Sequence, residues 1–95
     1  MKMLAIHWRD EAYGQHSGAQ AAFRLYDTAL MSDTAVRRIH GKARKAGFTF
    51  CFSRCSWIAC RIRAAHAFVG GVQALGYAVS HEECWRALPP PEAGG

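Results

Sequence analysis

The sequence predicts a small α+β fold dominated by helices, with about four helices and a short two-stranded sheet. The hydrophobic fraction of 51% is enough for a packed core. The length of 95 residues leaves no room for a second core. Apolar residues recur at spacings of three and four along much of the chain, as they do on one face of a helix. Two short stretches have the patterns of strands instead. We expect residues 1–88 to form a single globular domain, and the Pro- and Gly-rich residues 89–95 to form a frayed tail.

The two predicted strands have different patterns. Residues 3–8, MLAIHW, form a short apolar run without a helical period. Residues 48–53, FTFCFS, alternate strictly, so that their phenylalanines share one side of the strand. Aromatic side chains in this arrangement are typical of a sheet's core face, although they could also stack on unpaired bases. We therefore expect the two strands to pair, with Phe48, Phe50 and Phe52 in the core.

Two helices are predicted between these strands, at about 17–31 and 33–46, as a tight helix–turn–helix pair. Ser17 is a suitable N-cap for the first helix. The apolar residues of that helix share one face: Ala19, Ala22, Phe23, Tyr26 and Leu30. Ser32 and Asp33 can cap the second helix, and Gly47 can end it in the left-handed conformation.

The stretch from 55 to 75 fits two structures. As a helix, it carries an apolar stripe that continues to Leu75, and Gly76 then supplies a stop. As a strand, residues 56–63 also alternate and would form a hairpin with residues 48–53. We favour the helix because the stripe is long and because no typical hairpin turn such as Asn-Gly joins the two stretches. The strand over 56–63 stays open as the alternative.

A short last helix is predicted at 80–88. Ser80 to Glu83 has the sequence of a capping box, in which a serine and a glutamate three residues later bond reciprocally to the backbone. The helices are expected to pack around the long one at 55–75. The expected core is then Leu4, Ile6, Phe23, Tyr26, Leu30, Val36, Ile39, Phe48, Phe50, Phe52, Ile58, Ile62, Val69, Val72, Leu75, Trp85 and Leu88.

Charge is the strongest functional signal in the sequence. Residues 32–63 contain eight Lys or Arg residues, and no Asp or Glu occurs between Asp33 and Glu82. The whole chain has a net charge of +5. Such a balance favours association with polyanions.

A small nucleic-acid-binding module or regulator is the function that this charge pattern favours. Cations on a helical face can hold phosphates of DNA or RNA, and the pattern does not choose between the two. The residues expected to do so are Arg37, Arg38, Lys42, Arg44 and Lys45 of the second helix, with Arg54 and Arg63 beyond it.

The order of helix, tight turn, basic helix and strand resembles a winged helix–turn–helix in pattern. In that resemblance, residues 33–46 are the helix that enters a groove, and residues 48–63 are the wing. Two departures weaken the resemblance: the basic helix has no Asn or Gln to contact adenine, and a third helix before the pair is missing.

A protein-binding modulator or inhibitor is the alternative function. It would dock the basic helix on an acidic protein surface and use an apolar stripe of the helix at 55–75 as its centre. Aromatic and Arg residues are the usual hot spots of such interfaces. The candidates are Trp57, Arg61, Phe68 and Trp85.

Other chemistry has less support in the sequence. Cys51, Cys55 and Cys60 include one zinc-like spacing, but a second matched pair is missing, so we expect reduced thiols, no metal and no cofactor. A phosphodiesterase-type enzyme would need His7 or His16, and no spacing around them demands catalysis. We therefore expect a protein that is not an enzyme.

The remaining expectations concern location and partners. No apolar stretch reaches the roughly 18 residues of a membrane-spanning helix, and no secretory signal is visible at Met1. We expect a cytoplasmic protein whose partner is nucleic acid or an acidic protein surface. The apolar surplus of the helix at 55–75 also allows a homodimer.

Overall fold

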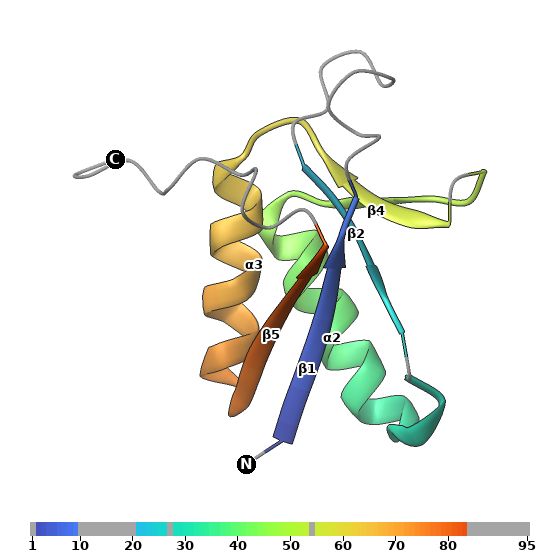
Figure 1. Cartoon of the computed structure of the whole chain (residues 1–95), viewed down its shortest axis with the longest axis vertical. Coiled ribbons are helices and arrows are strands. Elements are labelled where there is room, and N and C mark those ends of the chain that lie inside the picture. The colour runs from blue at the N-terminus through green and yellow to red at the C-terminus, as the bar shows by residue number, and fades with distance from the viewer. Residues whose placement is uncertain (1, 10–20, 27, 54, 84–95) are drawn as a thin grey trace.

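The described residues form a two-layer α+β structure in which two helices pack on one face of a five-stranded mixed sheet (Figure 1). The computed structural model describes residues 2–9, 21–26, 28–53 and 55–83. The elements follow the order β1 (Lys2–Trp8), β2 (Ala21–Leu25), the 3-10 helix η1 (Thr28–Leu30), α2 (Asp33–Ala46), β3 (Thr49–Cys51), β4 (Ser56–Ala59), α3 (Arg63–Ala74) and β5 (Tyr77–Glu83). The expectation of a helix-dominated fold with four helices and two strands is therefore wrong.

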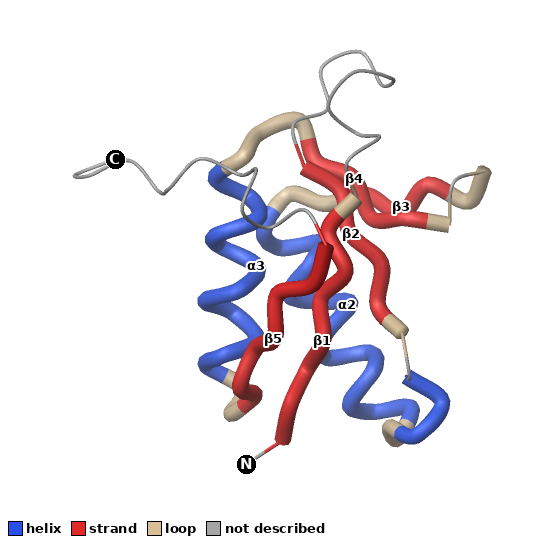
Figure 2. The backbone as a smooth tube through the Cα atoms, viewed as in Figure 1, coloured by secondary structure: helices blue, strands red, loops and turns tan. Residues whose placement is uncertain are grey.

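The sheet has the strand order β3-β4-β2-β1-β5, so β4, β2 and β1 lie inside it and β3 and β5 form its edges (Figure 2). β1 pairs antiparallel with β2 and parallel with β5, whereas β4 pairs antiparallel with both β2 and β3. The predicted strand at 3–8 is confirmed, but its expected pairing with 48–53 is wrong. β3 instead forms a hairpin with β4, which was the alternative for residues 56–63.

β2 and η1 occupy the described part of the helix predicted at 17–31, whose first residues, 17–20, lie outside the described residues. Its sequence, AAFRL, is compatible with a helix locally, but as a strand it hydrogen-bonds to β1 on one side and β4 on the other. Ala21, Ala22 and Phe23 are all at most 2% exposed, so this strand is buried on both faces. Tertiary pairing of that kind outweighs a weak helical preference. The expected core residues Tyr26 and Leu30 are exposed as a result, Leu30 by 92%.

α2 agrees with the prediction at both ends. The Ser32 hydroxyl accepts a hydrogen bond from the Ala35 backbone N–H at 3.1 Å, as an N-cap should. Gly47 ends the helix with φ of +112°, which is a left-handed conformation that favours glycine. Ile39 and Ala43 are its buried residues and fix it to the core.

α3 begins later than expected, at Arg63, and runs antiparallel to α2. Two distances show which parts of the helices are neighbours. A Cβ added to Gly47 would lie 3.8 Å from the Ala64 side chain, and a Cβ added to Gly71 would lie 3.2 Å from Lys42 Cδ. The end of α2 thus lies beside the start of α3. Gly71 lets the Lys42 side chain lie close against α3.

β5 takes the place of the first part of the helix predicted at 80–88. All seven of its residues are paired with β1, from Tyr77 opposite Lys2 to Glu83 opposite Trp8. The expected capping box does not form, because the Ser80 hydroxyl donates to the Glu82 carboxylate at 2.6 Å and the backbone continues as a strand. The rest of that predicted helix, 84–88, and the predicted tail at 89–95 lie outside the described residues.

The core lies between the sheet and the two helices and is rich in aromatic rings. Phe23, on β2, contacts the rings of Trp8, Phe48, Trp57 and Phe68. Other expected core residues that are buried are Leu4, Ile6, Ile39, Phe48, Val69 and Val72, and those that are only half-buried are Val36, Phe50, Ile58, Ile62 and Leu75. Phe52, which was expected in the core, is 84% exposed because β3 ends at Cys51.

Candidate nucleic-acid interface

The basic residues of α2 form one continuous face of the helix. Residues on a helix are about 100° apart, so the cations from Arg37 to Lys45 fill an arc of roughly 160° opposite Ile39 and Ala43. Arg37, Arg38, Arg44 and Lys45 are exposed, and Lys42, at the edge of this arc, is half-buried. We call these five residues the α2 basic face.

Lys42 has a structural role as well as a charge. Its stem lies against Gly71 of α3, where a Cβ would come within 3.2 Å of Cδ and 3.4 Å of Cβ. Long cationic side chains commonly pack their methylene groups on a neighbouring element in this way. Lys42 is therefore the member of the α2 basic face whose loss would affect helix packing.

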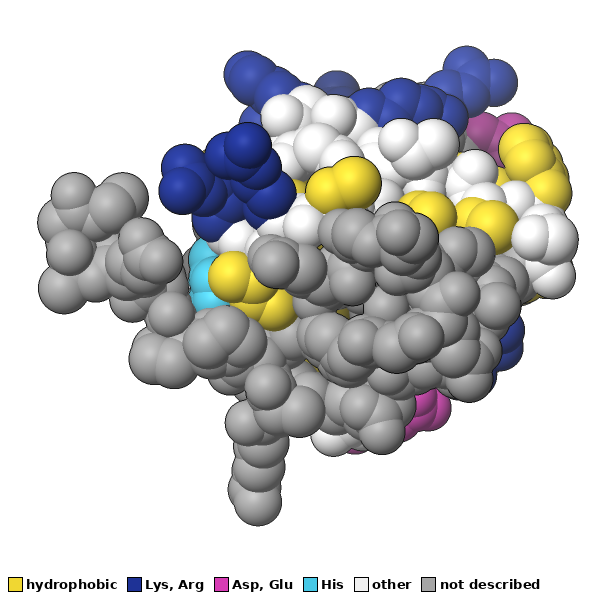
Figure 3. All heavy atoms as spheres, turned by 90° about the horizontal axis from the view of Figure 1, so that it is seen from above, with side chains coloured by type: hydrophobic (Ala, Val, Ile, Leu, Met, Phe, Trp, Pro, Cys, Tyr) yellow, Lys and Arg dark blue, Asp and Glu magenta, His cyan; other side chains and the backbone are white. Residues whose placement is uncertain are grey.

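The start of α3 extends the positive surface. Arg61 and Arg63 are both exposed. They belong to the end of the helix pair where α2 stops, because Gly47 lies beside Ala64. Seen from that end of the molecule, Lys and Arg side chains gather along one side of the surface (Figure 3). Arg54, the remaining predicted contact, lies outside the described residues.

No acidic group in the described part of the chain neutralises this surface. The ion pairs that join described residues connect Glu83 to His7 and to Arg9, at 3.7 Å each, and neither involves α2 or α3. Asp33, in the first turn of α2, is the acidic residue of that helix. The charge of the α2 basic face is thus left for a partner or for solvent ions.

Trp57 anchors one end of the α2 basic face to the sheet. The Arg44 guanidinium carbon lies 5.4 Å from the centre of the Trp57 ring, within cation–π range. His40 lies on the same ring, with 5.0 Å between ring centroids. Burial lowers the pKa of His40, and the positive charge of Arg44 lowers it further. His40 therefore contributes little positive charge at neutral pH.

Two of the residues proposed for protein docking are in the core. Trp57 is 4% exposed and Phe68 is 0% exposed, because both pack against Phe23. The apolar stripe of α3 is therefore covered by the sheet rather than presented to a partner. Arg61 is exposed, and Trp85 lies outside the described residues.

A second polar cluster lies at the junction of β1, β2 and β5, and sequence inspection identified only its histidine. The ring of His7 meets Tyr26 edge to face at 4.3 Å, and its Nδ1 lies 3.7 Å from Glu83 Oε1. Arg24 is the cross-strand partner of His7 and donates to the Ser56 hydroxyl at 3.0 Å. Strand register brings these groups together, so no sequence spacing could have shown it. An imidazole beside a carboxylate can transfer protons, but His16, the other histidine that a phosphodiesterase-type enzyme could use, lies outside the described residues.

The cysteines near the β3–β4 hairpin do not assemble a metal site with other described residues. Cys51, Cys55 and Cys60 form no disulfide with one another, and no group of three His, Cys, Asp or Glu side chains gathers within the described ranges. Cys51 contacts the Ser53 hydroxyl at 3.3 Å, and Cys55 donates to the Phe52 carbonyl at 3.5 Å. The Cys51 and Cys55 thiols thus make hydrogen bonds to groups two and three residues away in the chain.

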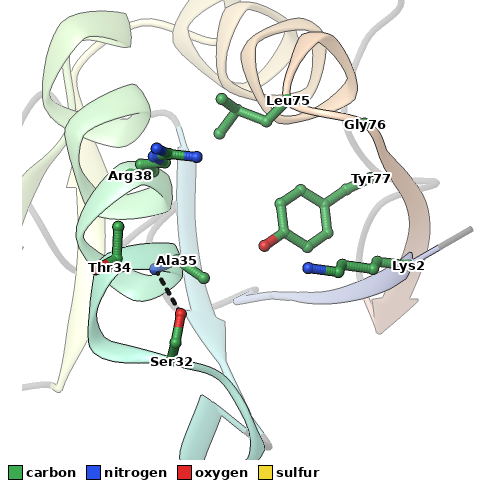
Figure 4. Close-up of a pocket in the computed structure, with 8 residues that line it drawn as sticks. All are labelled: Lys2, Ser32, Thr34, Ala35, Arg38, Leu75, Gly76 and Tyr77. Carbon is green, nitrogen blue, oxygen red and sulfur yellow. Dashed lines mark hydrogen bonds between the residues drawn. The ribbon is translucent and has the colours of Figure 1, made fainter.

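A pocket between α2 and the start of β5 was missed by the sequence analysis. It has a volume of about 450 Å³, and Arg38, Lys2 and Tyr77 are among its lining residues (Figure 4). Only Arg38 was a predicted site residue. Lys2 and Tyr77 gave no signal, because a single Lys and a single Tyr at the ends of strands have no pattern.

No known protein family, curated protein or solved structure shows significant similarity to the chain. Among the described residues, no helix is both long enough and apolar enough to cross a membrane.

Proposed function

We propose that the protein binds nucleic acid by holding phosphates on the α2 basic face. The observation that carries this proposal is a set of exposed cations on one helix without acidic partners in the described structure. Exposed Lys and Arg are common on protein surfaces. A cluster of them on one helical face without acidic compensation is the electrostatic footprint of a polyanion site. Arg61 and Arg63 extend the face at the start of α3.

The mode of contact differs from the one that the sequence suggested. A helix–turn–helix needs a helix before α2, and the chain there forms the strand β2 and the 3-10 helix η1. α2 also has no Asn or Gln that could bond to adenine. We therefore propose that the cations contact the phosphate backbone of DNA or RNA, which positions the protein without direct recognition of the base sequence.

Salt dependence gives the first test. Four exposed α2 cations, each neutralising one phosphate, predict a slope of about −3.6 for log Kobs against log salt on duplex DNA and about −2.8 on single strands. Duplex affinity should then fall about 150-fold between 50 and 200 mM salt. Fluorescence anisotropy with labelled oligonucleotides of both kinds measures these slopes. Binding that is absent, or equal at both salt concentrations, would overturn the proposal.

Matched single substitutions locate the site. Arg37→Gln and Arg9→Gln each remove one positive charge, but Arg37 lies on α2 and Arg9 pairs with Glu83 of β5. On duplex DNA, we expect Arg37→Gln to make the negative slope of log Kobs against log salt shallower by about 0.9. Arg9→Gln should leave the slope unchanged. Equal effects would show that net charge rather than this face determines binding.

Charge reversal at three positions should abolish binding altogether. Arg37, Arg44 and Lys45 are exposed, so the fold should survive their replacement by Glu. The melting temperature should fall, because Arg44→Glu removes the contact with the Trp57 ring and two acids then stand in the last turn of α2. Circular dichroism on the same samples checks that the fold survives. A correctly folded triple variant that still binds would rule out the α2 basic face.

A further inference from the structure

The pocket between α2, α3 and the start of β5 presents two cations and a phenol to one space. Its lining residues are Lys2, Ser32, Thr34, Ala35, Arg38, Leu75, Gly76 and Tyr77. In Figure 4 the Lys2 amine, the Tyr77 hydroxyl and the Arg38 guanidinium all point into the space between the helices and the first strand. Among the described residues, none that lines it is acidic.

Three separate elements bring these groups together. Lys2 and Tyr77 are neighbours because β1 and β5 are paired in parallel register from their first residues. Gly76, with φ of +98°, lets the chain turn from α3 directly into β5 and so places Tyr77 beside the pocket. Arg38 comes from α2, which runs antiparallel to α3 and so meets the end of that helix.

The polar groups of the pocket are available to a ligand. Within the described chain, Lys2 and Arg38 take part in no ion pair, and Tyr77 in no hydrogen bond. The N–H of Ala35, at the start of α2, already bonds to the Ser32 hydroxyl and is not available to a ligand. What remains is a cavity of about 450 Å³, in the size range of small-molecule sites, with a double positive charge.

We propose that this pocket binds a phosphate monoester. A monoester carries about −1.5 to −2 charges at neutral pH and three acceptor oxygens, which match Lys2, Arg38 and the Tyr77 hydroxyl. A phosphodiester has one charge only and fits the pocket less well. The volume leaves room for a group attached to the phosphate.

The monoester can be the terminal phosphate of a nucleic-acid strand or a free phosphorylated small molecule. The proposal goes beyond the binding of polymers on α2, since Arg38 is the one residue of the α2 basic face that lines the pocket. The two proposals can therefore fail separately.

The polymer arm of the test compares one single-stranded octamer with a 5′-phosphate, a 3′-phosphate or hydroxyls at both ends. Charge-assisted hydrogen bonds predict that one of the phosphorylated ends binds at least about tenfold tighter than the hydroxyl ends. Lys2→Met should remove this preference and leave the affinity for hydroxyl ends unchanged, because Lys2 is not part of the α2 basic face. Arg37→Gln, the control, should weaken all three octamers alike.

The small-molecule arm needs no binding of nucleic acid. Adenosine 5′-monophosphate, inorganic phosphate and adenosine are added at equal ionic strength, and the melting temperature is measured. A rise with the two phosphates but not with adenosine, lost in Lys2→Met and in Tyr77→Phe, supports the proposal even where no octamer binds. The proposal is overturned if a preference for phosphate in either arm persists in both Lys2→Met and Arg38→Gln. It is also overturned if neither arm shows any preference for phosphate.

Discussion

Replacing Phe23 should show how much of the fold depends on one strand residue. Phe23 is completely buried, and its ring centroid lies 4.4 Å from that of Phe68, 4.8 Å from Phe48 and 5.7 Å from Trp8. It therefore joins β1, β2 and α3 in one cluster. Truncation to alanine would leave a cavity between the sheet and the helices.

The expected cost is large compared with the total stability. Phe→Ala substitutions in cores cost about 3–5 kcal/mol, and lost aromatic contacts place this one toward the upper end. A chain of this length has roughly 5–14 kcal/mol of stability in all. Phe23→Ala thus removes a third of the stability or more, and Phe23→Leu, which fills part of the cavity, should cost roughly 1–3 kcal/mol.

Urea denaturation followed by circular dichroism and Trp fluorescence measures these costs. Phe52→Ala and Leu30→Ala are the controls, because those side chains are 84% and 92% exposed, and each should change stability by less than about 0.5 kcal/mol. All three positions would be core in the helical fold that the sequence predicts. If either control costs as much as Phe23→Leu, the placement of β2 and β3 is wrong.

Three further predictions concern two glycines and the histidines. Gly41→Ala should stabilise the protein by about 0.5–1 kcal/mol and raise its melting temperature by several degrees, because Gly41 is helical and a Cβ there meets no atom within 4 Å. Gly76→Ala should do the opposite because of its positive φ, and a gain there would contradict the turn. Burial lowers the pKa of His40 and of His81, with the charges of Arg44 and His66 as the second causes. The unfolded chain then binds more protons than the folded one below about pH 6.5, so these groups stabilise the fold above that pH and the contribution is lost on acidification. The melting temperature should fall between pH 7.5 and 5.5, by less in a variant with both histidines replaced by Gln, and identical pH profiles would contradict this.

The elements that the sequence predicted correctly depend on local interactions. α2 has its N-cap, its apolar stripe and its terminal glycine within sixteen residues, so nearly all the information for its boundaries is contiguous. β1 is a short apolar run flanked by polar residues, and its length alone favours a strand. Neither prediction required knowledge of a distant partner.

The errors occurred where distant pairing decides the structure. β2 and β5 carry signals that suit a helix, an alanine-rich face in one and a capping box in the other. They form strands because β1 offers two edges whose backbone groups must be paired, and one strand fills each edge. β4 is the intermediate case, because its sequence pattern fits both a strand and a helix. Its antiparallel pairing with β3 makes it a strand.

The α2 basic face can be located from the amino-acid sequence, because charge, periodicity and caps all lie within one helix. The burial of Trp57 and Phe68 in the core, and the pocket that Lys2, Arg38 and Tyr77 share, depend on how the elements pack. The physical reason is the same in each case. A helix places its side chains through hydrogen bonds between near neighbours, whereas a sheet and the pockets at its edges are set by pairing between residues up to 75 positions apart, such as Lys2 and Tyr77.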